Sequence, residues 1–217
     1  MKADEKMKIF VVGGTGRVGQ KMLEILSNSE YDVTAGARNP QDLVKFDKIQ
    51  VVNFDLTGTI DEMKKAITGF DVIIDVAGSA GNGLLQVDLF GATNLMQAAE
   101  KAGVKRFVLL STIFALQPEK WTTPGFIALR DYYIAKHFAD LYLTKNVNLD
   151  YTILQPGYLT ENSGTGKIAV NDDISAPATI EDVAETLVEL VKSDNTIGKV
   201  ITMHNGETEI SEVIKAI

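Results

Sequence analysis

The sequence predicts an α/β protein built on a doubly wound parallel sheet with helices on both faces. Short apolar runs rich in β-branched residues alternate with segments of helical periodicity, which is typical of this class. A glycine-rich turn joins the first apolar run to the first helical segment. The chain has 217 residues, of which 45% are hydrophobic, so we expect a single domain over residues 1–217 with one buried core.

Seven apolar runs are the expected strands of this sheet. Strands that helices cover on both faces are buried on both sides, so they appear as continuous apolar runs rather than as alternating ones. The expected strands are residues 8–12, 32–37, 49–54, 72–76, 107–111, 151–155 and 200–203.

Five segments between these runs carry apolar residues at helical spacing. The expected helices are residues 18–27, 60–67, 84–102, 126–144 and 180–192. Thr179 is the expected N-cap of the last helix, and Asp182 follows three residues later. In sheets of this kind ligands bind beyond the carboxyl ends of the strands, so the functional residues should follow the strands directly.

Composition excludes several classes of site and partner. The chain has no cysteine, which removes disulfides, thiol nucleophiles and the usual structural zinc sites. Its two histidines, His137 and His204, are too few for a histidine metal site, which leaves an all-carboxylate site as the alternative to the expected absence of a metal. A formal net charge of −8 argues against nucleic acid as a partner.

Membrane insertion and export are also not expected. No run approaches the roughly 18 apolar residues of a membrane span. Residues 1–8 are charged, and the apolar run after them is short and quickly becomes glycine-rich, which does not fit a signal peptide. We therefore expect a cytoplasmic protein.

The first expected strand ends in Gly13-Gly14-Thr15-Gly16-Arg17-Val18-Gly19, which contains both G-x-G-x-x-G and G-x-x-G-x-x-G spacings. In a dinucleotide site one glycine makes the tight turn, one lets the backbone approach the pyrophosphate and one lets the helix pack on the strand. The helix N-terminus then offers free N–H groups to the phosphates. An ordinary strand–helix turn is the alternative. The position between a first strand and a helix favours dinucleotide binding and a single-domain Rossmann fold.

The residues after the next three strands favour NADP(H) over NAD(H). An NAD site carries an acidic residue about 20 positions after the glycines, whereas this chain has Arg38, which can pair with a 2′-phosphate. A solvated surface charge is the alternative, and Arg17 would add a second contact. Asp55 either accepts from the adenine amino group or caps its own turn. Ala77 and Gly78 either supply small residues where the cofactor crosses the sheet or belong to a plain loop.

Four polar residues form a candidate proton-transfer group. Ser111 and Thr112 follow the fifth strand, and Tyr132 and Lys136 lie one helical turn apart, on one face. A cation near a phenol lowers its pKa toward neutral pH, and a hydroxyl can donate to a developing oxyanion. The alternative is a packed tyrosine beside a lysine with an extended stem. Tyr133 points elsewhere on the helix and is expected to pack.

Together these motifs resemble the short-chain dehydrogenase/reductase superfamily, and specifically its atypical, NmrA-like branch, from Met7 to about Met203. The resemblance implies that Pro156 and Gly157 lie against the nicotinamide and that Lys136 also touches its ribose. It also implies that residues 156–178 contribute the substrate side.

The function expected from these residues is an NADP-dependent oxidoreductase that reduces a small carbonyl, quinone or flavin-like substrate. The first alternative is an NADP(H)-binding redox sensor or scaffold without turnover. A sugar-nucleotide epimerase is less favoured, because residues 161–178 are few and rich in Gly, Ser and Asn. The expected partner is a small-molecule substrate, and the expected assembly is a monomer or a homodimer.

Overall fold

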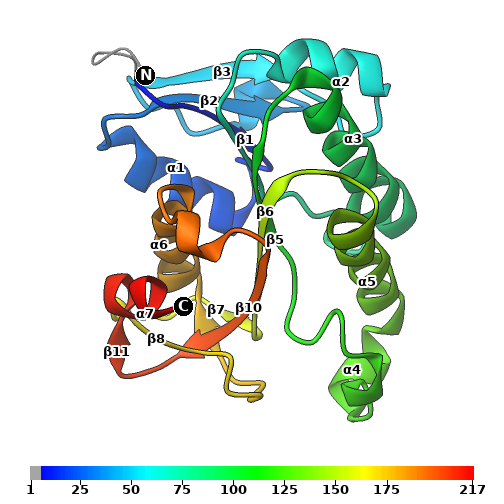
Figure 1. The fold of residues 1–217 in the computed structure, drawn as a ribbon, viewed down its shortest axis with the longest axis vertical. Coiled ribbons are helices and arrows are strands. Elements are labelled where there is room, and N and C mark those ends of the chain that lie inside the picture. Colours follow the sequence, from blue (N-terminus) through cyan, green and yellow to red (C-terminus); the bar gives the residue numbers. More distant parts are fainter. Residues whose placement is uncertain (1–5) are drawn as a thin grey trace.

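A computed structural model describes residues 6–217 and confirms the α/β fold class. Residues 1–5, which belong to the expected domain and to its charged N-terminal segment, lie outside the described residues. A nine-stranded sheet runs through the molecule in the order β11-β8-β10-β6-β5-β4-β1-β2-β3 (Figure 1). The six strands from β6 to β3 are parallel and follow the order of a Rossmann fold, and β10 continues the sheet parallel to β6.

All seven expected strands are present, with ends that differ from the expected ones by two residues at most. Most are apolar and largely buried, which is why the apolar runs identified them, whereas the edge strand β3 has no fully buried residue. The strands are β1 (Lys8–Val12), β2 (Asp32–Ala37), β3 (Ile49–Asn53), β4 (Val72–Asp75), β5 (Arg106–Leu110), β6 (Asp150–Pro156) and β10 (Lys199–Asn205).

Four shorter strands and a last helix were not expected. The antiparallel strands β8 (Lys167–Val170) and β11 (Thr208–Glu209) extend the sheet beyond β10, so its edge is mixed rather than parallel. The remaining elements are β7 (Leu159–Thr160), which pairs with β9 (Ala178–Thr179), and helix α7 (Ile210–Ala216). Strands of two to four residues carry too few side chains for a periodic pattern, and tertiary pairing decides their conformation.

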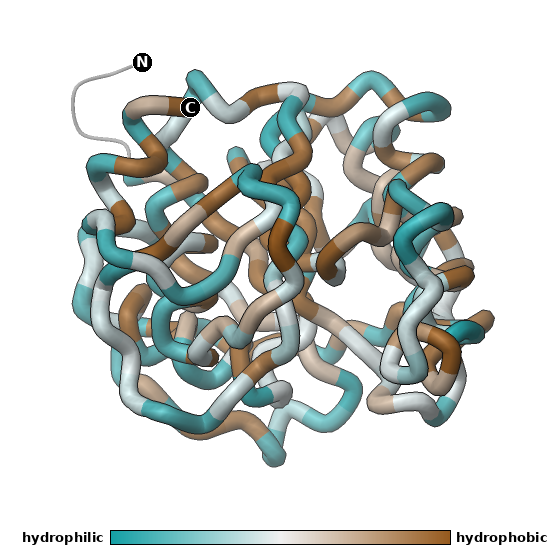
Figure 2. The backbone as a smooth tube through the Cα atoms, turned by 90° about the horizontal axis from the view of Figure 1, so that it is seen from below, coloured by the Kyte–Doolittle hydropathy of each residue, from teal (hydrophilic) through white to brown (hydrophobic). Residues whose placement is uncertain are grey.

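Two helical layers cover the sheet (Figure 1). Helices α1 (Arg17–Ser27) and α6 (Ile180–Val191) pack on one face, and α2 (Ile60–Ile67), α3 (Ala92–Ala102) and α5 (Arg130–Lys145) pack on the other. The hydrophobic segments run mainly through the interior between these layers (Figure 2). Within residues 6–217 no helix combines the length and apolar composition that a membrane span needs.

Two of the five expected helices are each divided into two elements. The expected helix 84–102 begins as a π-helix, Leu84–Gly91, and continues as α3. The expected helix 126–144 is two helices, α4 (Pro124–Ala128) and α5, which Leu129 separates with the non-helical angles φ −105° and ψ 21°. No residue of α4 is buried, and Phe126 packs its ring on Phe114 and Tyr133 only at the edge of the core.

Candidate functional site

Two adjoining cavities lie beyond the carboxyl ends of the parallel strands. The larger has a volume of about 990 Å³ and the smaller about 170 Å³. Both are lined by Gly16 of the first turn and by Val76, Ala77 and Gly78 after β4. A dinucleotide has two unequal halves joined by a diphosphate, so a pair of cavities that meet at the glycine turn fits this class of ligand.

The glycines of the first turn differ in what a side chain would meet. Gly13 has φ +90°, and an added Cβ would lie 2.5 Å from the backbone nitrogen of Ala77. At Gly19 the Cβ would lie 2.2 Å from Gly13 O, and at Gly14 it would lie 2.8 Å from a methyl group of Leu23. The folded chain itself therefore requires glycine at positions 13 and 19, where the clash is with backbone, while at Gly14 the leucine side chain can move aside.

Gly16 is the exception among these glycines. An added Cβ would meet only Gly13 O, at 3.4 Å, and the residue is the N-cap of α1 with extended backbone angles. The space in front of its backbone is therefore left open to the cavities. Thr15 lies beside it in the smaller cavity, and Val18 is buried and lines the larger one. These residues fit a diphosphate bound on the N-terminus of α1.

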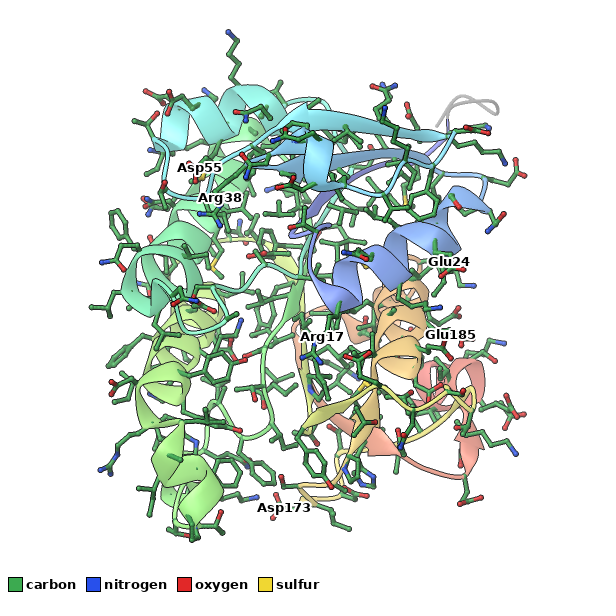
Figure 3. The ribbon with its side chains drawn as sticks, turned by 180° about the vertical axis from the view of Figure 1, so that it is seen from behind. Arg17, Glu24, Arg38, Asp55, Asp173 and Glu185 are labelled. Carbon is green, nitrogen blue, oxygen red and sulfur yellow. The ribbon has the colours of Figure 1, made fainter. Side chains whose placement is uncertain are left out.

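The smaller cavity carries the residues expected near the adenosine. Arg38 is exposed and lines this cavity, and its guanidinium has no carboxylate partner among residues 6–217. Asp55 lies at the same edge of the molecule (Figure 3). Its Oδ1 accepts hydrogen bonds from Thr57 N and Thr57 Oγ1, both at 2.9 Å, so Asp55 caps its own turn.

Arg17 lies away from Arg38, at the start of α1 (Figure 3). It lines the larger cavity and not the smaller one, and its Nη1 lies 2.8 Å from Oε1 of Glu161. The expected second contact to a 2′-phosphate is therefore not supported. The arginine instead joins the first turn to the segment that follows β7.

The expected hydroxyl groups come together in the larger cavity. Ser111, Thr112 and Tyr132 all line it, as does Tyr133. Thr112 Oγ1 donates to the hydroxyl oxygen of Tyr133 at 3.3 Å. Tyr133 packs in an aromatic cluster with Trp121 and Phe126, as expected, but its hydroxyl also reaches the site, which the sequence did not show.

The phenol of Tyr132 is harder to ionise than the sequence suggested. Burial raises its pKa above the ordinary value, and this effect exceeds the lowering that Lys136 and the hydrogen bond to Thr112 provide. Lys136 lowers this pKa, as expected, but burial outweighs its effect, so the net pKa does not move toward neutral pH. At neutral pH Tyr132 is a neutral phenol, able to donate a proton.

Lys136 is buried beneath the cavity, 4% exposed, and its Nζ donates to Leu110 O at 2.9 Å. Two further carboxyl groups share its surroundings, and the sequence did not single them out. Burial raises the pKa of Asp75 and of Asp140 to about 6 each, although the charge of Lys136 opposes both shifts. Lys136 uses one of its three N–H groups in this bond, so two remain for a ligand.

The floor of the cavity holds one more acidic group, Asp88. It lies on the π-helix, is 3% exposed and accepts from the Ser79 backbone N–H at 3.1 Å. The sequence carried a signal for both buried acids. Asp88 stands inside the mostly apolar segment 84–90, and Asp140 stands one helical turn after Lys136. Buried acids are uncommon unless they have partners or a function.

Pro156 and Gly157 line the larger cavity at the end of β6. Pro156 O accepts from Ile113 N at 2.8 Å, and Gly157 N donates to Met203 O at 2.9 Å. A Cβ at Gly157 would lie 1.8 Å from Ala176 O, so only glycine fits there. Within residues 6–217 no group of three His, Cys, Asp or Glu side chains could hold a metal ion.

Comparisons with known proteins agree with this geometry. The NAD(P)H-binding family matches residues 13–194 of the chain. The solved structure of the oxidoreductase ylbE from Lactococcus lactis is 59% identical, covers 97% of this chain and 96% of that one, and has a TM-score of 0.96. A Bacillus subtilis protein named as the uncharacterized sugar epimerase YhfK is 33% identical over 97% of this chain and 100% of its own length.

Proposed function

Because the chain belongs to the NAD(P)H-binding family, we propose that it is an NADPH-dependent reductase that acts on a small carbonyl, quinone or flavin-like acceptor. The observation that carries the proposal is that Thr112, Tyr132 and Lys136 line the same cavity as Gly16 of the diphosphate-binding turn. A proton donor, a cation and a nucleotide site thus share one space, which is what hydride and proton transfer to a carbonyl requires.

The preference for NADPH rests on the end of β2. Arg38 stands where an NAD site carries an acidic residue, and it lies in the smaller cavity without a carboxylate partner among residues 6–217. A guanidinium can bind a 2′-phosphate with two parallel hydrogen bonds. We therefore propose that the guanidinium of Arg38 binds the 2′-phosphate of NADPH.

When bound at the glycine turn, NADPH would supply the hydride for the carbonyl carbon. Tyr132 donates its proton to the carbonyl oxygen, so the C=O group becomes CH–OH and a tyrosinate remains, which solvent reprotonates. Thr112 turns its proton from the long, 3.3 Å contact with Tyr133 to the same oxygen and donates a hydrogen bond to it as negative charge develops. Lys136, held by Leu110 O, keeps a positive charge beside the tyrosinate and stabilises it.

The walls of the larger cavity favour an apolar, flat acceptor. Only three cationic side chains line it, and of these Arg17 is paired with Glu161 and Lys136 with a carbonyl oxygen. Most of the other large side chains are apolar or aromatic, and they surround the space beside Tyr132. These are Leu84, Phe126, Ile127, Leu129, Tyr158 and Leu159.

A sugar epimerase is the second candidate, which the name of the Bacillus subtilis relative suggests. Epimerisation through an oxidised intermediate begins with removal of a hydroxyl proton, which needs an ionised base. The raised pKa of Tyr132 favours the reverse direction, because a neutral phenol donates a proton and does not take one. A sugar nucleotide would also bring a second diphosphate. Among residues 6–217, Arg130 is the one cation lining the cavity that has no partner in the protein, and a single cation disfavours binding of a diphosphate there.

The test is Tyr132→Phe in an NADPH oxidation assay with naphthoquinones and aromatic aldehydes as acceptors. We expect kcat to fall by about 10²–10⁴-fold, the usual contribution of a positioned general acid. Tyr142→Phe, a change on the same helix outside the cavity, should retain the activity. Unchanged turnover in Tyr132→Phe would remove Tyr132 from the chemistry, and a lack of turnover in the wild type, despite NADPH binding, would favour the sensor.

A further inference from the structure

Asp140 is fully buried, 0% exposed, and no step of the proposed reaction uses it. Its Oδ2 accepts two hydrogen bonds, from Ser111 Oγ at 2.7 Å and from Gln155 Nε2 at 2.9 Å. Its Oδ1 has no hydrogen-bond partner among residues 6–217. A buried carboxylate with one unused oxygen is costly, so the hydrogen bonds that its other oxygen accepts call for a role that offsets this cost.

The contact with Ser111 decides which hydrogen bonds that serine can make. A hydroxyl has one proton and two lone pairs. At 2.7 Å the proton of Ser111 is committed to the carboxylate below it, while Ser111 itself lines the larger cavity. Ser111 is therefore an acceptor toward a ligand, and not the donor to an oxyanion that the sequence suggested. Tyr132 remains a donor, and so does Thr112, whose proton makes only a long, 3.3 Å contact with the Tyr133 hydroxyl and can turn from it to a ligand.

Two other contacts hold this arrangement in place. Lys136, one turn before Asp140 on α5, donates to Leu110 O. The helix therefore makes hydrogen bonds to two successive residues, Leu110 and Ser111, at the end of β5. Gln155 of β6 fixes the carboxylate from the neighbouring strand. The direction of the Ser111 proton is thus set from α5 and β6 together.

We propose that Asp140 is a positioning residue that makes Ser111 a hydrogen-bond acceptor for an N–H or O–H group of the ligand in the larger cavity. The inference deepens the proposed function and rests on it for the ligand. Two sources supply such a donor: the carboxamide of a nicotinamide ring, or a hydroxyl of the reduced substrate.

The first arm of the test compares NADP⁺ with its 3-acetylpyridine analogue, in which a methyl group replaces the carboxamide NH₂. Binding is followed through the fluorescence of Trp121, the only tryptophan, which packs on Tyr133 beside the cavity. We expect the wild type to bind NADP⁺ about tenfold more tightly than the analogue, as one net hydrogen bond implies. Ser111→Ala should bind both equally, and Ser27→Ala, outside the cavity, should behave as wild type.

Variants of Asp140 separate positioning from a structural role. In Asp140→Asn the amide oxygen still accepts from Ser111 and Gln155, because the Gln155 amide donor disfavours the flipped orientation, so the discrimination should persist. In Asp140→Leu the serine proton is free to turn toward the cavity, and the discrimination should disappear while NADP⁺ still binds. Equal discrimination by Asp140→Leu and wild type would overturn the positioning role.

The second arm uses 1-naphthol and 1-methoxynaphthalene as probes on the protein saturated with NADP⁺. A preference for the naphthol that Ser111→Ala abolishes and Asp140→Asn retains identifies the substrate hydroxyl as the donor. If Ser111→Ala changes discrimination in neither arm, the proposal is wrong. Failure of the proposed function is seen separately, because it removes NADPH oxidation and leaves the cofactor arm intact.

Discussion

Gly16 differs from the neighbouring glycines because the fold itself leaves room for a side chain there, so the absence of a side chain serves a ligand. We predict that Gly16→Ala keeps the fold, since the nearest atom to its Cβ is Gly13 O at 3.4 Å, and that it weakens NADP(H) binding at least tenfold by blocking the diphosphate. Gly13→Ala should instead destabilise the protein by more than about 1 kcal/mol, because its φ is +90° and its Cβ would meet Ala77 N. Thermal unfolding and titration calorimetry of the two variants check this contrast.

Equal loss of cofactor affinity and stability in both glycine variants would contradict this division. The sequence predicted the ligand class of the turn because the spacing of its glycines is a local property. It did not show which glycine faces the ligand, since that depends on Ala77 and Leu23, which the fold brings to the turn.

The two buried carboxyls next to Lys136 give the protein a defined pH dependence. Burial raises the pKa of Asp75 and Asp140 from 3.8 to about 6, so the folded state binds more protons than the unfolded state between these values. The free energy of unfolding should therefore contain a contribution that falls as pH rises from about 4 to 6, on the order of 2–3 kcal/mol per carboxyl before coupling between the groups.

Asp140→Asn removes one of these titrations and keeps the hydrogen bonds to Ser111 and Gln155. Urea unfolding at a series of pH values should show the variant gaining stability relative to the wild type as pH rises through about 6. A difference between the two proteins that is independent of pH, or that has the opposite slope, would show that Asp140 is already ionised in the folded state at low pH.

At the scale of elements, buried strands were predictable and the helical segments at the cavity were not. The strands β1, β4 and β5 in the centre of the sheet are nearly continuous apolar runs, whose pattern follows from burial on two faces. The π-helix Leu84–Gly91 is also nearly continuous in apolar residues, so no periodicity distinguished it from an α-helix. The break at Leu129 has no local signal, because α4 lies beyond the core.

Helix α4 should therefore contribute to substrate binding and not to stability. Ile127 and Leu129 are 54% and 55% exposed, yet both line the larger cavity. We predict that the double change to Ser shifts the free energy of unfolding by less than about 0.5 kcal/mol per residue and raises KM for an apolar quinone about tenfold. Phe138→Ser, at a residue 53% exposed on α5 outside the cavity, is the matched control and should leave KM unchanged.

At the scale of the molecule, the large cavity lies between the sheet with its first four helices and the C-terminal segment that carries β7 to β9. Two ion pairs connect these parts, Arg17 with Glu161 and Lys120 with Asp173, and of the four residues Arg17 lines the cavity. Ion pairs of this kind join residues far apart in the sequence, so a single sequence does not predict which residues pair. They explain why the substrate side was the least predictable part of the site.

A cofactor that binds the glycine turn and the strand ends β1, β4 and β6 contacts elements from both halves of the chain, so its binding free energy should appear as stability of the whole molecule. At a concentration about 100 times its Kd, NADP⁺ should add about 2.7 kcal/mol and raise the Tm by roughly 5–10 °C. NAD⁺ at the same concentration should raise it less, because it lacks the 2′-phosphate proposed for Arg38.

Arg38→Ala tests that assignment with the same readout. The loss of a charge-assisted contact should reduce the NADP⁺ shift to the size of the NAD⁺ shift, and leave the NAD⁺ shift and the Tm of the free protein nearly unchanged, because Arg38 is exposed and has no ion-pair partner among the described residues. Arg17 lines the other cavity, so Arg17→Ala should not distinguish the two cofactors: the Tm shifts with NADP⁺ and NAD⁺ should both fall or both stay the same. An NADP⁺ shift that survives in Arg38→Ala would assign the 2′-phosphate to another residue.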